Sequence, residues 1–181
     1  MKNNQTQKNI PKGWEEKSFD RCVVLLTKIE GVKKSDYNNF GKYPVFDQGQ
    51  DYISGYTNDK NFLNDGKLPV ILFGDHTRVF KLINEPFVVG NDGIKLFLGN
   101  DNIDTNYLYF YLLNINVPNT GYNRHFKFLK ESDVLFPKDI KEQKRIAEIL
   151  GEVDKEIEKT NEIIEKTEKL KKGLMILITS S

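Results

Sequence analysis

The chain has very little cysteine or histidine and no long apolar run. Its 181 residues include one cysteine and two histidines, and no apolar stretch approaches the about 18 residues of a membrane span. A single cysteine, Cys22, cannot build a disulfide framework or a thiolate zinc site, so it indicates a reducing compartment. The polar first nine residues contain no apolar segment of the kind found in secretory signals. We therefore expect a cytoplasmic protein with no metal site.

The chain also lacks an excess of charge of either sign. Lys and Arg number 27 and Asp and Glu number 26, giving a formal net charge of +1. A protein that binds nucleic acid over its whole surface is strongly basic, which this chain is not. Any contact with phosphate must therefore use a local patch.

Catalytic motifs are missing as well. The sequence contains no Gly-x-x-x-x-Gly-Lys-Ser/Thr or Gly-x-Gly-x-x-Gly phosphate loop, no Gly-x-Ser-x-Gly elbow and no Asn-Pro-Pro-aromatic tetrad of amino-methyltransferases. The two histidines lie far apart and have no metal-ligating partner at helical spacing. We expect a binding protein with no catalytic residues and no cofactor. The enzymatic alternative is a nuclease that uses Asp75, His76 and Asp92.

What the chain does have is a long amphipathic segment at its C-terminal end, from Asp139 to about Thr179. Asp139 can cap its first turn, and Glu142 follows at capping-box spacing. A helix of this length extends roughly 60 Å, too far for one small domain to cover its apolar stripe. The heptad pattern predicts a coiled coil, most simply a homodimer. The apolar positions of this seam are Ile146, Leu150, Val153, Ile157, Ile164, Leu174 and Ile178.

Three polar residues interrupt the seam at heptad positions: Thr160, Thr167 and Lys171. They either set the register of the helix pair or yield to Ile163 and Leu170 as the stripe drifts at 3.6 residues per turn. We favour the second interpretation.

Before the helix, short apolar runs alternate with turn sequences such as Asn64-Asp-Gly66 and Asn91-Asp-Gly93. One helix is predicted from Thr105 to about Leu113, capped by Asp104. The fold class is therefore α+β: a β-rich domain over residues 1–138, followed by the long helix over residues 139–181. The expected strands are Cys22–Ile29, Tyr43–Phe46, Leu68–Phe73, Arg78–Ile83, Phe87–Val89, Ile94–Leu98 and Val134–Phe136.

Three segments collect amides, cations and aromatic rings, which can contact base edges and phosphates. Each could also be an ordinary surface turn. The third segment, 118–130, is the most distinctive because its cations alternate with aromatic residues and no acid is present. The candidate DNA contacts are Gln48, Gln50, Tyr52 and Tyr56 in the first segment, His76, Thr77, Arg78 and Lys81 in the second, and Tyr122, Asn123, Arg124, His125 and Lys127 in the third.

Several short motifs, in this order, resemble those of the specificity subunits of type I restriction–modification systems (HsdS). Each motif is weak alone, but together they cover most of the chain. They are Ile10-Pro-Lys-Gly-Trp14, Tyr43-Pro-Val-Phe-Asp-Gln-Gly-Gln50, Ser54-Gly-Tyr-Thr57, Phe73-Gly-Asp-His-Thr-Arg78, Gly90-Asn-Asp-Gly93, Tyr107-Leu-Tyr109, Asn119-Thr-Gly-Tyr-Asn-Arg-His125, Glu142-Gln-Lys-Arg-Ile-Ala147 and Lys169-Leu-Lys-Lys-Gly-Leu-Met175.

The resemblance implies a non-catalytic subunit that recognises double-stranded DNA. Members of this family carry two target recognition domains, each followed by a long helix, and each domain reads one half of a bipartite target. The subunit recruits methyltransferase (modification) subunits, and restriction/motor subunits join the complex. This chain has one domain and one helix, so it resembles a half-subunit that pairs with itself or with a second specificity chain. The rival interpretation is a stand-alone coiled-coil DNA-binding regulator or a mimic of a specificity subunit.

Overall fold

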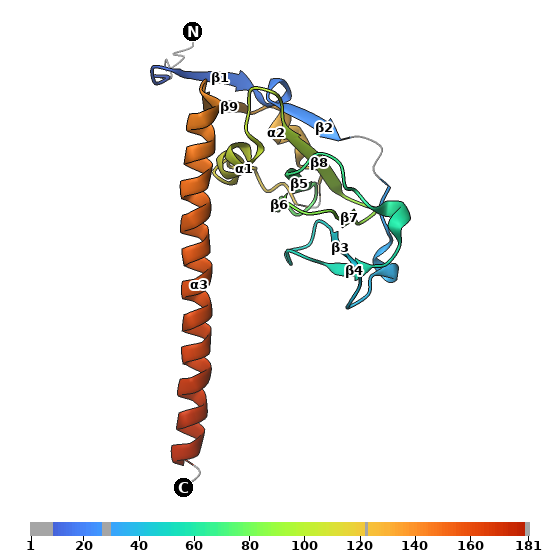
Figure 1. The fold of residues 1–181 in the computed structure, drawn as a ribbon, viewed down its shortest axis with the longest axis vertical. Helices are drawn as coiled ribbons and strands as arrows, with labels where there is room; N and C mark the ends of the chain where they lie inside the picture. The colour runs from blue at the N-terminus through green and yellow to red at the C-terminus, as the bar shows by residue number, and fades with distance from the viewer. Residues whose placement is uncertain (1–8, 27–29, 122, 180–181) are drawn as a thin grey trace. The chain divides into compact units, whose positions relative to one another are not determined.

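The computed structural model describes residues 9–26, 30–121 and 123–179. The chain divides into two compact units, residues 1–144 and residues 145–181. The first unit is a β-rich body, and the second consists of the remaining turns of one long helix (Figure 1). The predicted α+β class, a β-rich domain followed by a long C-terminal helix, is confirmed.

The described residues of the body form three small sheets. A central antiparallel sheet has the strand order β2-β8-β5-β6. A second sheet, β4-β3-β7, pairs β3 with β4 in antiparallel fashion and with β7 in parallel fashion. The third sheet pairs β1 with β9, antiparallel. The strands are β1 (Trp14–Ser18), β2 (Val23–Leu26), β3 (Tyr43–Phe46), β4 (Gly55–Thr57), β5 (Val70–Gly74), β6 (Phe80–Ile83), β7 (Val88–Val89), β8 (Ile94–Gly99) and β9 (Asp133–Pro137).

Three α-helices accompany the strands, namely α1 (Thr105–Leu113), α2 (Phe126–Lys130) and α3 (Ile140–Thr179). Helix α1 has the predicted bounds and the predicted cap, because the Asp104 carboxylate accepts a hydrogen bond from the Tyr107 amide at 3.0 Å. The Asp139 cap of α3 is also present, with a bond from the Lys141 amide at 2.9 Å. Three 3-10 turns complete the body: Phe19–Arg21, Lys34–Asp36 and Lys60–Phe62.

The first turn of α3 is fixed to the body by a buried side chain, that of Gln143. Its amide nitrogen donates to the Asn102 and Pro137 carbonyls at 2.9 and 2.8 Å, and its oxygen accepts from the Asp104 amide at 2.8 Å. All three bonds are buried or partly buried, so they fix where the helix leaves the body.

Strand β5 forms the middle of the core. It lies between β8 and β6, and all five of its residues are buried, as expected of a strand covered on both faces. The hydrophobic cluster around it includes Phe46, Ile83 and Phe87. Cys22 is also fully buried, and burial raises the pKa of its thiol to about 11, so it stays protonated near neutral pH.

Several predicted strand bounds were wrong. The run predicted over Cys22–Ile29 is a strand only from Val23 to Leu26 in the described part, and residues 27–29 lie outside it. The Leu68–Phe73 strand begins later, at Val70, after a cis Leu68–Pro69 bond. The Arg78–Ile83 strand begins at Phe80, because Arg78 has a φ of 64° and belongs to the turn. Strands β1 and β4 and helix α2 were not predicted.

Candidate nucleic-acid interface

The second predicted segment forms the tight turn between β5 and β6. The Arg78 amide donates to the Gly74 carbonyl at 2.7 Å, and the Gly74 amide donates to the Val79 carbonyl at 2.8 Å. Arg78 occupies the left-handed region, which a non-glycine residue adopts at a cost of about 1 kcal/mol or more. Its guanidinium donates to the Val117 carbonyl at 3.1 Å. Arg78 therefore joins this turn to the segment after α1.

A buried pair, Asp75 and His125, links the second and third predicted segments. The His125 ring contacts the Asp75 carbonyl through Nδ1 at 2.9 Å, and its Nε2 accepts from the Thr120 amide at 3.3 Å. With Nε2 as the acceptor, Nδ1–H is the donor to the Asp75 carbonyl. The Asp75 carboxylate accepts from the Phe126 amide at 2.8 Å. These bonds hold His125 and Phe126 against the β5–β6 turn, and Thr120 is joined to them through the His125 ring.

The third segment owes its alternation of cations and rings to a one-turn amphipathic helix, α2. Phe126 is buried and packs edge-on against Phe19, with ring centroids 5.9 Å apart. Lys127 is exposed on the other side, with its ammonium 5.0 Å from the Phe128 ring centroid. Residues Phe126–Lys130 therefore form a helix whose buried ring, Phe126, belongs to the core.

Only part of the third segment is presented to solvent. Arg124 and Asn123 are exposed, whereas the candidate His125 is completely buried and structural. The Asn123 side-chain amide bonds to the Thr120 carbonyl, which stiffens the turn. The candidate Tyr122 lies outside the described residues.

The first predicted segment is organised by the Asp47 carboxylate. One of its oxygens accepts from the Gly49 amide at 2.8 Å and from the Ser54 hydroxyl. Burial and this neighbouring carboxylate raise the pKa of Tyr37 to about 12. Asp47 is therefore a scaffold residue that shapes the loop from β3 to β4.

Gln48 is fixed in a cradle made by two glycines. A Cβ added to Gly93 would lie within 2.6 Å of the Gln48 amide carbon, and one added to Gly74 would lie 2.9 Å from its Cβ. The Gln48 side-chain oxygen accepts from the His76 amide at 3.3 Å. With its oxygen used in this way, Gln48 acts as a support for the β5–β6 turn. Gln50, which follows it, is exposed.

The side chains of Lys81 and Tyr52 also stabilise the loop between β3 and β4. Lys81 is 2% exposed, and its ammonium donates to the Asp51 carbonyl; burial lowers its pKa. The Tyr52 hydroxyl donates to the Leu82 carbonyl, and its ring packs edge-on against Phe46. We therefore leave Lys81 out of the proposed DNA contacts. Tyr56 is half-buried in β4 and pairs with Asn38 through its backbone.

A polar recess of about 370 Å³ joins the first two segments to residues that the sequence did not single out as contacts. The β7–β8 turn, Gly90–Gly93, forms one of its walls and presents exposed Asn91 and Asp92. Lys34 lies at another edge. The glycine-rich turn sequence was visible in the chain, but nothing local indicated that it faces Gln48. The recess is lined by Lys34, Tyr37, Asp47, Gln48, Gly49, His76, Thr77, Gly90, Asn91 and Asp92.

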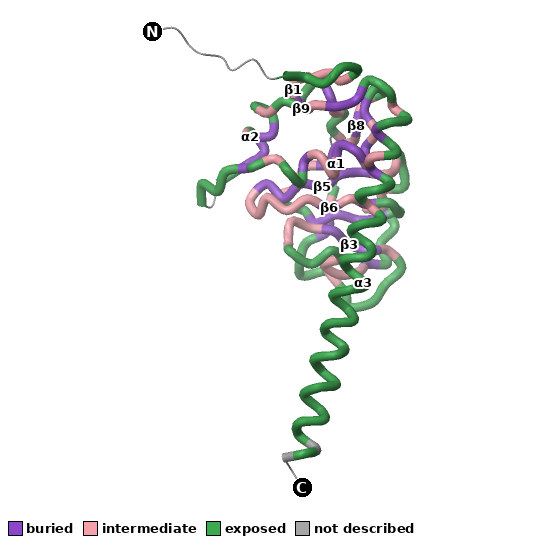
Figure 2. The backbone as a smooth tube through the Cα atoms, turned by 90° about the vertical axis from the view of Figure 1, so that its left-hand side faces the viewer, coloured by how far each residue is buried: buried purple, intermediate pink, exposed green. Residues whose placement is uncertain are grey.

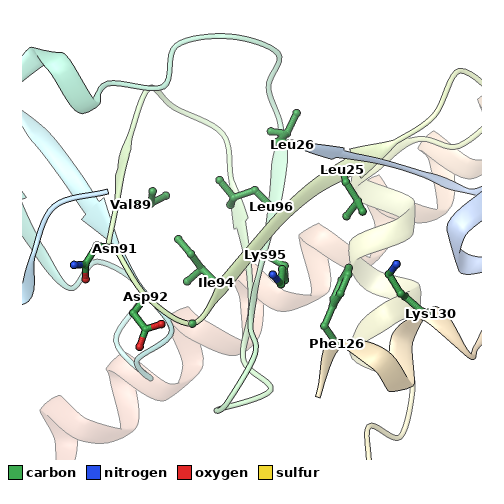
Figure 3. A pocket seen from close by; sticks show the side chains of 12 residues that line it. Leu25, Leu26, Val89, Asn91, Asp92, Ile94, Lys95, Leu96, Phe126 and Lys130 are labelled. Carbon is green, nitrogen blue, oxygen red and sulfur yellow. The ribbon is translucent and has the colours of Figure 1, made fainter. Parts of the chain in front are cut away.

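Figure 3 shows a second recess, which the same turn also borders. Asn91 and Asp92 lie at one end of it, and Leu25, Phe126 and Lys130 lie at the other. Ile94 and Leu96 lie between these two ends. The β7–β8 turn therefore contributes residues to the lining of both recesses.

The seam of the long helix is exposed along the second unit. Figure 2 shows α3 as exposed over nearly all of that length, and the apolar side chains share this exposure. Leu150 is 38% exposed and Ile157 is 52% exposed, values far above those of core residues. Ile163 and Leu170 are more exposed still. A stripe of this length is typical of a helix whose partner is another helix.

Across the described residues, no cluster of three or more potential metal ligands is present. Within the same residues, no helix is long and apolar enough to cross a membrane.

The sequence matches the family model described as "Type I restriction modification DNA specificity domain" over residues 11–169. The chain belongs to this family. The match extends over the body and most of α3, so the predicted family membership is confirmed.

Individual members of the specificity family are similar to parts of the chain. The EcoR124I/EcoR124II specificity subunit of Escherichia coli is 32% identical over 84 residues, which are 45% of this chain and 21% of that protein. The S subunit from M. genitalium superposes with a TM-score of 0.64 at 24% identity, covering 93% of this chain and 45% of that one. The HsdS subunit from Thermoanaerobacter tengcongensis gives 0.55 at 16% identity, covering 85% and 40%. The chain spans less than half the length of each relative.

Proposed function

We propose that this chain is one half of a type I specificity subunit, which binds one half of a bipartite DNA target and recruits methyltransferase subunits. The observation that carries this proposal is the family match over residues 11–169 together with the exposed seam of α3. The body supplies one recognition unit, and the seam requires a second helix. A second copy of the chain satisfies this requirement, and the target is then an inverted repeat, because protein symmetry is mirrored in the half-sites.

The polar recess and the exposed part of the third segment support a DNA-reading face. The contacts of Asp75 bring His125 and Phe126 to the β5–β6 turn, which itself borders the recess. Exposed cations such as Arg124 and Lys127 suit phosphates, and exposed amides such as Gln50 and Asn91 suit base edges.

The two threonines in the seam support an apolar pairing interface. The Thr160 hydroxyl donates to the Glu156 carbonyl, and the Thr167 hydroxyl donates to the Ile163 carbonyl, both at 2.7 Å. Hydroxyls satisfied within their own helix need no partner across the interface. Ile163 and Leu170 then extend the apolar surface on either side of Thr167.

In this proposal the chain performs no chemistry and holds no cofactor. Methyl transfer from S-adenosylmethionine belongs to the modification subunits, and restriction/motor subunits join through the complex. The single buried thiol, Cys22, fits a reducing cytoplasm where the DNA is found.

Replacing both Arg124 and Lys127 with Ala is expected to weaken DNA binding and to reduce its dependence on salt. Each lost phosphate contact lowers the slope of log K against log salt by about 0.9, so the double variant loses about two units if both cations touch phosphate. Fluorescence anisotropy from low to moderate salt measures the slope, with a duplex selected by the wild-type protein from a random pool. Lys12→Ala combined with Lys67→Ala removes the same charge elsewhere on the exposed surface. An unchanged slope in the Arg124/Lys127 variant would show that α2 and Arg124, which precedes it, are not part of the DNA interface.

The experiment that tests the proposed function is reconstitution of methylation. The purified chain is mixed with type I modification subunits and DNA, and transfer of labelled methyl groups from S-adenosylmethionine is followed. Transfer that requires the chain, at sites forming an inverted repeat, supports a symmetric half-subunit. DNA binding without any methylation would instead favour a stand-alone regulator. Methylation only when a second specificity chain is added would replace the homodimer with a mixed pair.

A further inference from the structure

Phe40 is the most exposed large apolar side chain of the described body. It is 87% exposed, whereas the next most exposed, Tyr52, is 50% exposed. Single apolar residues at a surface are common. A phenylalanine exposed to this extent, however, gains almost none of the free energy that burial of its ring would give. In the sequence, Asn38-Asn-Phe-Gly-Lys42 is typical of an ordinary turn, so no local pattern predicts that Phe40 is exposed.

The turn that carries Phe40 is held firmly on both sides. Asn38 and Tyr56 exchange two backbone hydrogen bonds of 2.8 Å, which add Asn38 to the edge of β4. The Lys42 amide donates to the Asn58 side chain at 2.9 Å. Gly41 lies so close to Tyr56 that a Cβ would come within 2.9 Å of the Tyr56 Cβ. The ring is therefore presented from a braced support, which reduces the entropy lost when it binds.

The surroundings of Phe40 are basic. Lys33, Lys34 and Lys42 are exposed within the same segment, and its one acid, Asp36, accepts a hydrogen bond from the Ser35 hydroxyl at 2.8 Å. In a chain with a net charge of only +1, this is a local cationic patch. Lys34 also lines the polar recess beside Gln48 and His76, so the patch is continuous with the proposed reading face.

From these observations we infer that residues 33–42 form a further DNA contact. Phe40 packs as an apolar wedge against bases in a groove, and the three lysines contact the neighbouring phosphates. Apolar wedges flanked by cations are a recurrent way to grip and deform duplex DNA. This inference rests on the proposed function and adds to it a contact element outside the three segments identified from sequence. A protein partner is the competing occupant, but three exposed lysines in the same segment as the ring favour a polyanion.

The first test compares Phe40→Ala with Phe40→Trp in the full chain, using a duplex selected by the wild-type protein. Loss of a ring–base contact is expected to raise Kd roughly ten-fold, and Trp is expected to restore most of the binding. Leu113→Ala, a comparable truncation of an exposed apolar residue in α1, provides the control and leaves Kd unchanged. Thermal unfolding should match the wild type in all three variants, because neither Phe40 nor Leu113 is buried.

The second test identifies what the ring touches. A photoreactive benzoyl-phenylalanine at position 40 is irradiated in the complex of the chain, the selected duplex and modification subunits. Crosslinking to DNA is expected. Crosslinking to a modification subunit, or a Phe40→Ala variant that binds the duplex as tightly as the wild type, would overturn the inference. If the wild type selects no duplex at all, the proposed function itself fails.

Discussion

Replacing Leu150, Val153 and Ile157 together with Asp is expected to convert a dimer of about twice 21.0 kDa into a monomer. In a pair of helices the change removes six buried apolar side chains and introduces six carboxylates. At about 1.5 kcal/mol for each lost side chain, the apolar contribution alone is roughly 9 kcal/mol, or more than a million-fold in Kd. Multi-angle light scattering over micromolar concentrations measures the mass.

A matched control uses the opposite face of the same helix. Lys155, Lys159 and Lys166 are exposed, and at 100° per residue they lie away from the seam. Changing all three to Gln alters the net charge by −3, the same as the triple Asp variant. Two exposed ion pairs to Glu156 and Glu162 are lost, which cost little. This control is expected to stay dimeric. Dimers in the triple Asp variant would contradict helix pairing, and a wild-type monomer would direct the search to a different partner chain.

Asp75→Ala is expected to have the largest effect among single substitutions near the reading face. The carboxylate is 3% exposed and accepts a 2.8 Å bond from the Phe126 amide, which would be left buried without an acceptor. Loss of a charged acceptor of this kind costs about 3 kcal/mol. The free energy of unfolding, measured by urea titration of the body's tertiary signal, should fall by that amount. DNA affinity should fall as well, because the N-terminal end of α2 loses an attachment to the β5–β6 turn.

Asp75→Asn shows whether the loss of stability comes from the missing hydrogen bond or from the missing negative charge. The amide oxygen can still accept from Phe126, so most of the stability should return, and with it DNA binding. A nuclease that depended on the Asp75 carboxylate would not be rescued in this way, whereas a positional role would be. Equal destabilisation by Ala and Asn would show that the negative charge, and not the hydrogen bond, holds the turn.

Local signals explain which elements could be predicted from sequence. Helix α1 follows from the Asp104 cap and an apolar run of helical length, and β3 follows from four residues bounded by polar turns. Strand β4 has only three residues, Gly55–Thr57, and exists because β3 lies beside it. No local pattern indicates such a pairing.

The candidate site was harder to predict because exposure is a tertiary property. Arg124 and His125 are neighbours of similar chemistry, yet one is exposed and the other is fully buried against Asp75. As a cation in the second segment, Lys81 was a natural candidate for a phosphate contact. Its ammonium, however, is enclosed by the loop that contains Asp51. Phe40 shows the reverse case, a residue typical of a core that projects from a turn.

The antiparallel pairing of β1 with β9 bears on how proteins of this kind can evolve. Trp14 lies opposite Pro137, so the chain enters and leaves the recognition body on adjacent strands. A unit whose ends meet in this way can be exchanged, duplicated or inserted between other segments without rerouting the polypeptide. Genetic recombination with breakpoints near these two strands would then deliver a new DNA specificity while leaving the pairing helix untouched.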